Sequence, residues 1–154
     1  MANTYTRLYI QIVFAVQGRQ NLIQKSWKND LNKYISGTIT NLGHKSINVN
    51  GMPDHIHTFV GLHPSIAISD LVREIKTSSS LFINQNKLVH GKFNWQAGYG
   101  AFSYSQSQIT QVYDYIANQE IHHKKKTFKD EYLDFLKEFD ITYDNKYLFD
   151  FIDL

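Results

Sequence analysis

The sequence predicts an α+β domain in which strands and helices follow one another as β-α-β-β-α-β, with two further helices at the end. Three observations support this prediction: short segments with alternating apolar residues, longer segments with apolar residues at helical spacing, and glycine or proline between them. The chain has 154 residues, of which 42% are hydrophobic and 14% aromatic, and a single domain of this size can bury a substantial core. This composition excludes a disordered or fibrous protein.

The first two elements are predicted to be a strand and a long amphipathic helix. Every second residue from Leu8 to Val16 is apolar, so we expect a strand that turns one face toward the core. From Ser26 to Leu42, apolar residues recur every three or four positions, which is the spacing of one helix face. Gly43 follows at a position where glycine commonly ends a helix.

Residues 45–49 and 55–62 are predicted to form two antiparallel strands. The segment between them contains Gly51 and Pro53, and both residue types are typical of a turn. A second helix is predicted over residues 69–85, although its Thr-Ser-Ser-Ser stretch has a low helix propensity.

A fourth strand is predicted over residues 98–104, followed by two helices. Ser105 has a glutamine three positions on and Thr127 has an aspartate there, so both match the start of a capped helix. The first six elements have the order of a ferredoxin-like split β-α-β sandwich with a central antiparallel sheet. Because many functions share this fold, function must be argued from individual side chains.

Charge is distributed unevenly along the chain. Residues 1–129 carry 14 Lys and Arg against 6 Asp and Glu, a net charge of +8, whereas residues 130–154 carry 2 against 8, a net charge of −6. A basic body attracts polyanions, and the acidic end could shield that body or pack against it. A solvated charged surface explains the same numbers.

Missing features also limit the function. The chain has no cysteine, which excludes disulfides, zinc–thiolate sites and thiol nucleophiles. The longest apolar stretch, Tyr9 to Val16, is too short to span a bilayer, and the N-terminus lacks the apolar segment of a signal peptide. We therefore expect a cytoplasmic protein.

His55 and His57 form a potential metal-binding pair. In the predicted strand, residues two apart point to the same face with their Cα atoms about 6.5–7 Å apart, so both imidazoles can bind one cation. Ile56 between them faces the core. A His-x-His sequence also arises by chance, and the two histidines could equally be structural.

A second group lies in the predicted helix that starts at Ser105. Tyr115 and Gln119 are four residues apart and share one helix face. A tyrosine hydroxyl can attack phosphorus and form a covalent intermediate when a cation polarises the phosphate, and Gln119 could add a carbonyl oxygen to the two imidazoles. The alternative is that Tyr115 is one of ten tyrosines, half-buried and inert.

Four segments occur in the order and with the spacing of one enzyme family. They are YIQIVFAVQGRQ (residues 9–20), MPDHIH (residues 52–57), WQAGYGAF (residues 95–102) and YIANQ (residues 115–119). Together they make the chain, over residues 5–125, resemble the single-tyrosine transposases of the HUH superfamily. These enzymes are encoded by insertion sequences that move as single-stranded DNA, and they include REP-associated relatives. The superfamily name describes the pattern of histidine, hydrophobic residue and histidine.

The resemblance implies a role for each of four residues. His55, His57 and Gln119 would bind a divalent cation, Mg²⁺ or Mn²⁺, and Tyr115 would be the nucleophile. Tyr113 is the obvious competitor, but the position four residues after it is an alanine, which cannot bind a metal.

The resemblance also implies the reaction and the partners. The protein would be a transposase that cleaves and rejoins single-stranded DNA through a 5′-phosphotyrosine intermediate and a free 3′-hydroxyl. It would recognise hairpins near the ends of the element, and it would act as a homodimer whose active sites join the histidine pair of one subunit to the tyrosine helix of the other. The alternative is a non-catalytic, domesticated protein that binds single-stranded nucleic acid, which would not need all four residues.

The rest of the chain gives less specific signals. We interpret residues 1–154 as a single transposase domain, with a catalytic core over residues 1–125 and an acidic, aromatic extension over residues 126–154 that has no assigned role. Residues 147–152 are too apolar for a free tail, so we expect them to pack on the protein or on a second subunit. His122 and His123 could belong to a solvated helix end or to a phosphate-contacting patch beside the active site, and His122 could also approach the metal. The basic residues that could contact the DNA backbone are Arg7, Arg19, Arg73, Lys76, Lys124 and Lys125.

Overall fold

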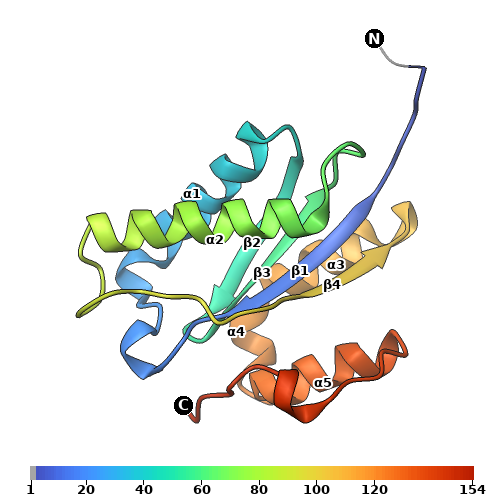
Figure 1. The fold of residues 1–154 in the computed structure, drawn as a ribbon. Helices are drawn as coiled ribbons and strands as arrows, with labels where there is room; N and C mark the ends of the chain where they lie inside the picture. The colour runs from blue at the N-terminus through green and yellow to red at the C-terminus, as the bar shows by residue number, and fades with distance from the viewer. Residues whose placement is uncertain (1–2) are drawn as a thin grey trace.

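The computed structural model describes residues 3–154, which form a four-stranded antiparallel sheet with helices on both faces (Figure 1). The elements are β1 (Tyr9–Ala15), α1 (Lys25–Asn41), β2 (Lys45–Met52), β3 (His55–Gly61), α2 (Ile68–Gln85), β4 (Gly100–Tyr104), α3 (Ile109–Ala117), α4 (Gln119–His122) and α5 (Phe128–Glu138), with 3₁₀ helices at Arg19–Asn21, Gln106–Gln108 and Asn145–Tyr147. The strand order β2-β3-β1-β4 is that of the predicted ferredoxin-like sandwich. Within residues 3–154, no helix is long and apolar enough to cross a membrane.

The helices α1 and α2 cover one face of the sheet (Figure 1). Leu31 of α1 and Ile75 of α2 pack against Ile12 and Ile56 of the two central strands, and all four side chains are fully buried. These positions are the ones that the helical and strand periodicities predict for a core.

The opposite face of the sheet is covered by α3 and α5. Val13 and Phe102 pack against Phe135 of α5, and the rings of Phe102 and Phe135 stack with their centroids 5.0 Å apart. The prediction that one face of the first strand lies in the core is confirmed by Ile12 and Phe14, and α5 covers the second face of β1 as well. The strand is also shorter than predicted, since it begins at Tyr9 and Leu8 is exposed.

The last helices begin near their predicted caps. The Thr127 hydroxyl accepts the Asp130 N–H at 3.2 Å, and the Gln108 side chain accepts the Ser105 N–H at 2.9 Å. A 3₁₀ turn lies between Ser105 and the start of α3, and Asn118 separates α3 from α4. The prediction of one continuous helix from Ser105 through the tyrosine and beyond is therefore wrong.

The C-terminal run packs on the same chain. Phe149 is buried against α5, with its ring centroid 4.9 Å from that of Tyr132. Gln96 fixes the backbone beside it, because its side chain accepts the Asp150 N–H at 2.7 Å and donates to the Asp150 carbonyl at 2.8 Å. The expectation that residues 147–152 pack on the protein is confirmed, although the first of them is exposed.

Candidate active site and metal centre

His55 and His57 lie side by side on the face of β3 that α5 covers. Both side chains are fully buried, and their ring centroids are 5.0 Å apart. The strand is fixed on both sides, because β3 pairs with β1 and with β2. In the β2 pairing, Gly51 lies opposite Ile56, where any larger residue would press on the backbone of the histidine strand.

The Nδ1 atoms of the two histidines, called here the inner ring nitrogens, each donate to an oxygen acceptor. His55 Nδ1 lies 2.7 Å from a carboxylate oxygen of Asp54, and His57 Nδ1 lies 2.7 Å from the amide oxygen of Gln11. The Gln11 side chain is itself oriented by its amide, which donates to the Tyr104 hydroxyl at 3.0 Å. Both Nδ1 atoms must therefore carry hydrogen, so each ring, when it is neutral, has its lone pair on Nε2, the atom that faces the site.

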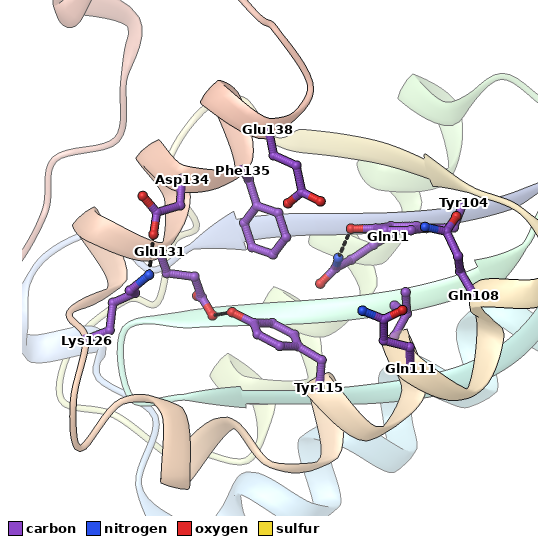
Figure 2. Close-up of a pocket in the computed structure, with 11 residues that line it drawn as sticks. Gln11, Tyr104, Gln108, Gln111, Tyr115, Lys126, Glu131, Asp134, Phe135 and Glu138 are labelled. Atoms are coloured by element: carbon purple, nitrogen blue, oxygen red, sulfur yellow. Dashed lines mark hydrogen bonds and ion pairs between the residues drawn. The ribbon is translucent and has the colours of Figure 1, made fainter.

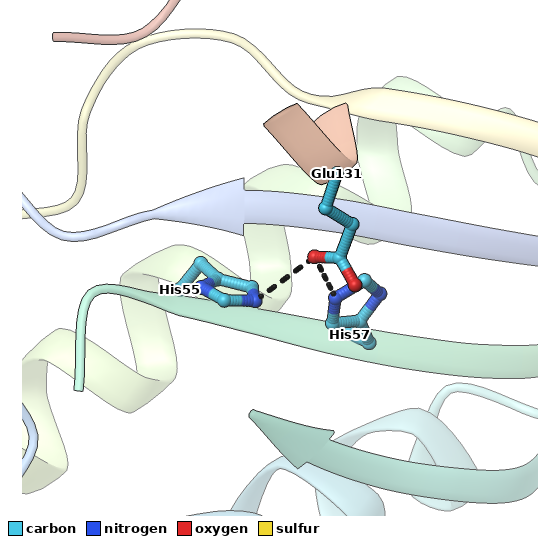
Figure 3. A group of neighbouring side chains, drawn as sticks. All are labelled: His55, His57 and Glu131. Atoms are coloured by element: carbon cyan, nitrogen blue, oxygen red, sulfur yellow. Dashed lines mark hydrogen bonds and ion pairs between the residues drawn. The ribbon is translucent and has the colours of Figure 1, made fainter. Parts of the chain in front are cut away.

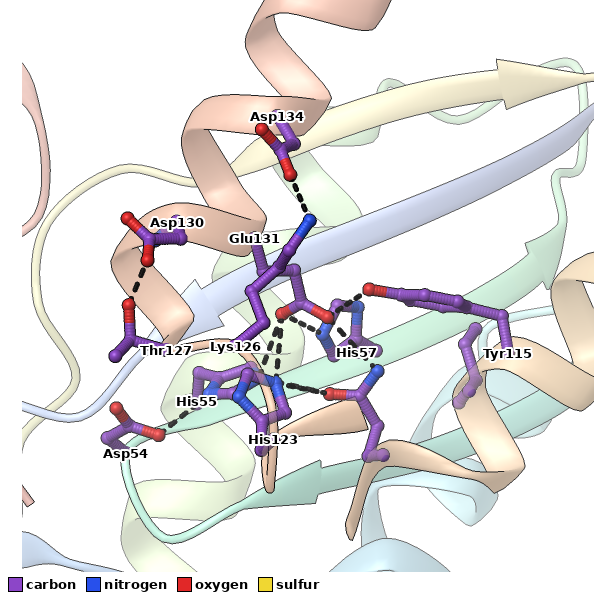
Figure 4. A network of polar contacts seen from close by, with 12 residues as sticks. Asp54, His55, His57, Tyr115, His123, Lys126, Thr127, Asp130, Glu131 and Asp134 are labelled. Carbon is purple, nitrogen blue, oxygen red and sulfur yellow. Dashed lines mark hydrogen bonds and ion pairs between the residues drawn. The ribbon is translucent and has the colours of Figure 1, made fainter. Parts of the chain in front are cut away.

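Glu131 of α5 meets both outer ring nitrogens (Figure 3). Its Oε1 atom lies 3.1 Å from His57 Nε2, 3.3 Å from His55 Nε2 and 3.2 Å from His123 Nε2. Its Oε2 atom accepts hydrogen bonds from the Tyr115 hydroxyl and, at 3.2 Å, from the Gln119 amide. With 3% of its side chain exposed, Glu131 is a buried carboxylate that joins the histidines to the tyrosine (Figure 4).

Gln119 completes the contact between the tyrosine helix and the strand. Its amide oxygen lies 3.2 Å from His55 Nε2 and 3.1 Å from His123 Nε2, and its side chain is fully buried. The four residues singled out in the sequence thus come together within one chain. The ring of Tyr115 is half-buried, with its centroid 6.1 Å from that of His57.

The two histidines after Gln119 have different positions. His122 stacks on the Tyr115 ring with centroids 4.5 Å apart, and its buried Nε2 atom has no hydrogen-bond partner within residues 3–154. The suggestion that His122 approaches the metal position is therefore wrong. His123 is the histidine that faces Glu131 and Gln119.

Burial and charge shift the pKa values of these groups. Burial opposes a charge on His55, but its contacts with Asp54 and Glu131 outweigh that effect and raise the pKa of His55 to about 9. Burial lowers the pKa of His57 despite the nearby Glu131 carboxylate. Burial would raise the pKa of Glu131, yet the surrounding imidazoles, first that of His57, hold it far below its usual value. Burial and then the Glu131 charge raise the pKa of Tyr115, so the phenol retains its proton firmly in this arrangement.

The donor set suits a divalent cation. One atom each from His55, His57 and Glu131 lies within 4.8 Å of the other two, and all three side chains are buried. Two neutral imidazoles and one carboxylate form a common ligand set for divalent metals, and the Asp54 and Gln11 contacts supply the outer hydrogen bonds that metal-binding histidines usually have. The residues present therefore fit the metal that the sequence predicts.

A cavity of about 300 Å³ opens beside Tyr115 (Figure 2). Tyr115 and Glu131 lie at its inner end, and Phe135 lines one wall. Lys126 and Asp134, which form an ion pair, lie at its edge. The cavity reaches Tyr115 and Glu131, whereas His55 and His57 are buried behind Glu131 and do not line it.

The predicted DNA-contacting residues do not gather around this site. Arg73 and Lys76 lie on α2, which covers the other face of the sheet. Arg73 pairs with Asp70 at 3.0 Å, and the Lys76 ammonium donates to two backbone carbonyls. Arg19 donates to the carbonyl of Asp153. The remaining three are exposed, with one near the N-terminus and two in the turn between α4 and α5: Arg7, Lys124 and Lys125.

Glu131 is a site residue that the sequence analysis missed, and His123 was named only as part of the helix end or of a phosphate-contacting patch. His123 lies four residues after Gln119, so helical spacing could have included it. Glu131 follows Phe128 by three positions and precedes Phe135 by four, which places an acidic residue on the apolar face of α5. A charged residue on a buried face is the signal that could have found it.

The chain was compared with curated proteins, with solved structures and with models of protein families. Among curated proteins, none matches. A structure of a candidate transposase from Deinococcus radiodurans matches with a TM-score of 0.60 and 21% identity, covering 77% of this chain and 95% of the other. A REP-associated tyrosine transposase, whose structure was solved bound to a REP hairpin, matches with a TM-score of 0.57 and 15% identity, covering 80% of this chain and 73% of the other. Residues 4–119 match the family model described as "Transposase IS200 like", so the chain belongs to the IS200-like transposase family.

Proposed function

We propose that this protein cleaves and rejoins single-stranded DNA with Tyr115 as the nucleophile, through a 5′-phosphotyrosine intermediate. The observation that carries the proposal is the meeting of the tyrosine and the histidine pair on one buried carboxylate, Glu131. Such a meeting is expected where a nucleophile and a bound cation act on the same phosphate. The family match to the IS200-like transposases supports the same reading.

The reaction can be written with the residues of this chain. The Tyr115 oxygen attacks the phosphorus of a phosphodiester and forms a new O–P bond, while the bond from phosphorus to the 3′ oxygen breaks and that oxygen becomes a 3′-hydroxyl. Glu131 Oε2 accepts the tyrosine hydrogen bond and so orients the attacking oxygen, and the phenol proton passes by way of water to the departing 3′ oxygen. Rejoining reverses these steps, because a 3′-hydroxyl attacks the phosphotyrosine.

The metal would be held by His55, His57 and Gln119. When bound, Mg²⁺ or Mn²⁺ would polarise the phosphate and stabilise the charge that develops on its oxygens. The task of Asp54 and Gln11 is to fix the two imidazoles with their Nε2 atoms directed into the site.

The proposed substrate is single-stranded DNA with a hairpin near the cleavage point. Support comes from the REP-associated transposase of similar fold, whose structure was solved with a REP hairpin. The proposal also includes a homodimer, as the family resemblance implies. Because the four site residues meet within one chain, the dimer would not be needed to assemble this site.

The experiment compares Tyr115→Phe with the wild-type protein. Labelled single-stranded DNA from the regions flanking the gene, including any hairpin, is incubated with protein and Mn²⁺ and then run on a denaturing gel. Wild type is expected to give a covalent adduct that EDTA abolishes. Tyr115→Phe retains the ring that packs on His122 but lacks the attacking oxygen, so both cleavage and adduct should vanish.

Tyr113→Phe is the matched control. Tyr113 lies on the same helix, is exposed, and is not among the residues that contact Glu131, so this variant should form the adduct as the wild type does. An adduct that persists in Tyr115→Phe but is lost in Tyr113→Phe would reassign the nucleophile. DNA binding without any wild-type adduct, with metal present, would replace the enzyme by the non-catalytic binding protein.

A further inference from the structure

We propose that Glu131 is itself a ligand of the metal at His55 and His57, so that the C-terminal helix α5 supplies part of the metal site. This inference rests on the proposed function for the presence of the metal. Glu131 lies beyond residues 4–119, the part of the chain that matches the family model. The histidine strand and the tyrosine helix lie inside that part.

The distances at Glu131 are those of neighbouring ligands on one cation. Two ligands about 2.1 Å from a metal are roughly 3.0 Å apart at a right angle and about 3.4 Å apart at a tetrahedral angle. Glu131 Oε1 lies 3.1 Å from His57 Nε2 and 3.3 Å from His55 Nε2, within that range. A cation can therefore be shared by these three atoms with little movement of the side chains.

The hydrogen-bonding pattern also calls for a positive charge between these atoms. Asp54 and Gln11 take the Nδ1 hydrogens, so a neutral ring has only a lone pair to present to the Glu131 oxygen. Lone pairs that face each other in a buried site repel, unless a proton or a cation lies between them. One divalent cation balances the two buried carboxylates of Asp54 and Glu131 while both imidazoles remain neutral.

The position of Glu131 is set by packing on both sides of it along α5. Thr127 caps the helix, and the Phe128 ring lies parallel to the His55 imidazole, with centroids 3.9 Å apart and an angle of 3°. One turn later, Phe135 stacks on Phe102 of the sheet. A carboxylate held between two packed aromatic residues loses little conformational entropy on binding a metal, which favours a ligand role.

The remaining oxygen of Glu131 links the metal to the nucleophile. Oε2 accepts the hydrogen bond of the Tyr115 hydroxyl, while Oε1 faces the histidines. A carboxylate that binds the cation through one oxygen would hold the tyrosine hydroxyl beside that cation through the other. Glu131 would then be a ligand and a positioning residue at once.

The test measures Mn²⁺ binding directly, by isothermal titration and by the loss of the free-ion signal in electron paramagnetic resonance. Glu131→Gln keeps the size of the side chain and removes its charge. We expect its Kd for Mn²⁺ to rise at least about 10-fold, since even residues that only support a metal ligand change affinity by roughly 10–100-fold. Asp134→Asn removes a negative charge at an exposed position about one turn further along the same helix. This control variant should bind Mn²⁺ as the wild type does.

A second variant covers a failure of Glu131→Gln to fold. Glu131→Asp keeps the charge but withdraws the carboxylate by one methylene, and it too should bind Mn²⁺ more weakly than the wild type. Mn²⁺ affinity equal to that of wild type in the Glu131 variants would overturn the proposal and leave Glu131 as a counter-ion of the histidines. His57→Ala is the positive control and should lose binding.

The outcomes separate this inference from the proposed function. If the wild type forms the DNA adduct and Glu131→Gln binds Mn²⁺ normally, the ligand assignment alone fails. If Mn²⁺ binding depends on Glu131 but no adduct forms, the DNA-cleaving function fails and the metal site remains. If the wild type binds no Mn²⁺ at all, the ligand assignment and the metal-dependent mechanism both fail.

Discussion

Gly51→Ala tests whether the backbone of the histidine strand is as tightly confined as the structure indicates. Gly51 is buried in β2 and pairs with Ile56 across the hairpin. A Cβ atom built there would lie 2.9 Å from the Ile56 Cα atom and well within the van der Waals contact distance of the His55 carbonyl oxygen. These neighbours are backbone atoms, so no rotation of a side chain can relieve the clash.

The expected cost follows from overpacking of a core. Insertion of one methyl group into a packed interior costs about 1–3 kcal/mol, and a fixed backbone neighbour places this site toward the upper end. For a domain of this size each kcal/mol changes Tm by roughly 2–4 °C, so Gly51→Ala should lower Tm by about 2–12 °C. The strain falls on the backbone of His55 and Ile56, so the affinity of the site for Mn²⁺ should fall as well.

Gly37→Ala provides the matched control. Gly37 lies within α1 and is exposed, and no atom of the described part of the chain lies within 4 Å of a Cβ added there. Alanine has a higher helix propensity than glycine, so the free energy of unfolding of this variant should increase by about 0.5–1 kcal/mol. Circular dichroism during heating and urea titration measures both variants, and the Mn²⁺ titration follows the site. A Gly51→Ala protein with the Tm and Mn²⁺ affinity of the wild type would refute the argument that this hairpin confines the histidine strand.

Three further predictions concern pH, the oligomeric state and the subunits that form each site. Burial lowers the pKa of Lys76 from 10.5 to about 8, so between these pH values the unfolded chain binds more protons than the folded protein. The contribution of Lys76 to the free energy of unfolding should therefore rise with pH across that window. Urea titrations of wild type and Lys76→Met should differ by this rise, and an identical pH dependence of the two proteins would contradict the prediction. The proposed homodimer should give a light-scattering mass near twice 18.0 kDa, and a mass near 18.0 kDa with cleavage intact would remove the dimer. Because the structure assembles each site from one chain, a mixture of the His57→Ala and Tyr115→Phe proteins should form no DNA adduct. Adduct formation by this mixture would show that the tyrosine helix is exchanged between subunits.

The elements of the fold could be predicted because their signals are local. The alternation in β1 and the helical spacing in α1 and α2 appear within single segments, and their order determines the sandwich. The second buried face of β1 could not be predicted in this way, because residues such as Val13 are covered by a helix more than a hundred positions later. Tertiary docking of α5 leaves no periodic signal in the strand that it covers.

The same distinction applies to the site. His55 and His57 share a face through strand geometry, and Tyr115 and Gln119 lie near each other through helical spacing even though Asn118 interrupts the helix. The family resemblance then supplied their roles. Glu131 enters the site only through the docking of α5, which no spacing in the sequence specifies.

The presence of Glu131 on the buried side of α5 is a conflict between stability and function. A buried carboxylate costs several kcal/mol unless it is paired, and an apolar residue among Phe128, Tyr132 and Phe135 would stabilise the docked helix at no such cost. The histidines that compensate Glu131 are themselves buried, and their inner nitrogens are already used by Asp54 and Gln11. A packed core has no need for this arrangement, whereas the proposed metal site, with Tyr115 as its nucleophile, would require each part of it. The helix that covers the sheet therefore stabilises the fold through its aromatic residues and serves the site through its one buried acid.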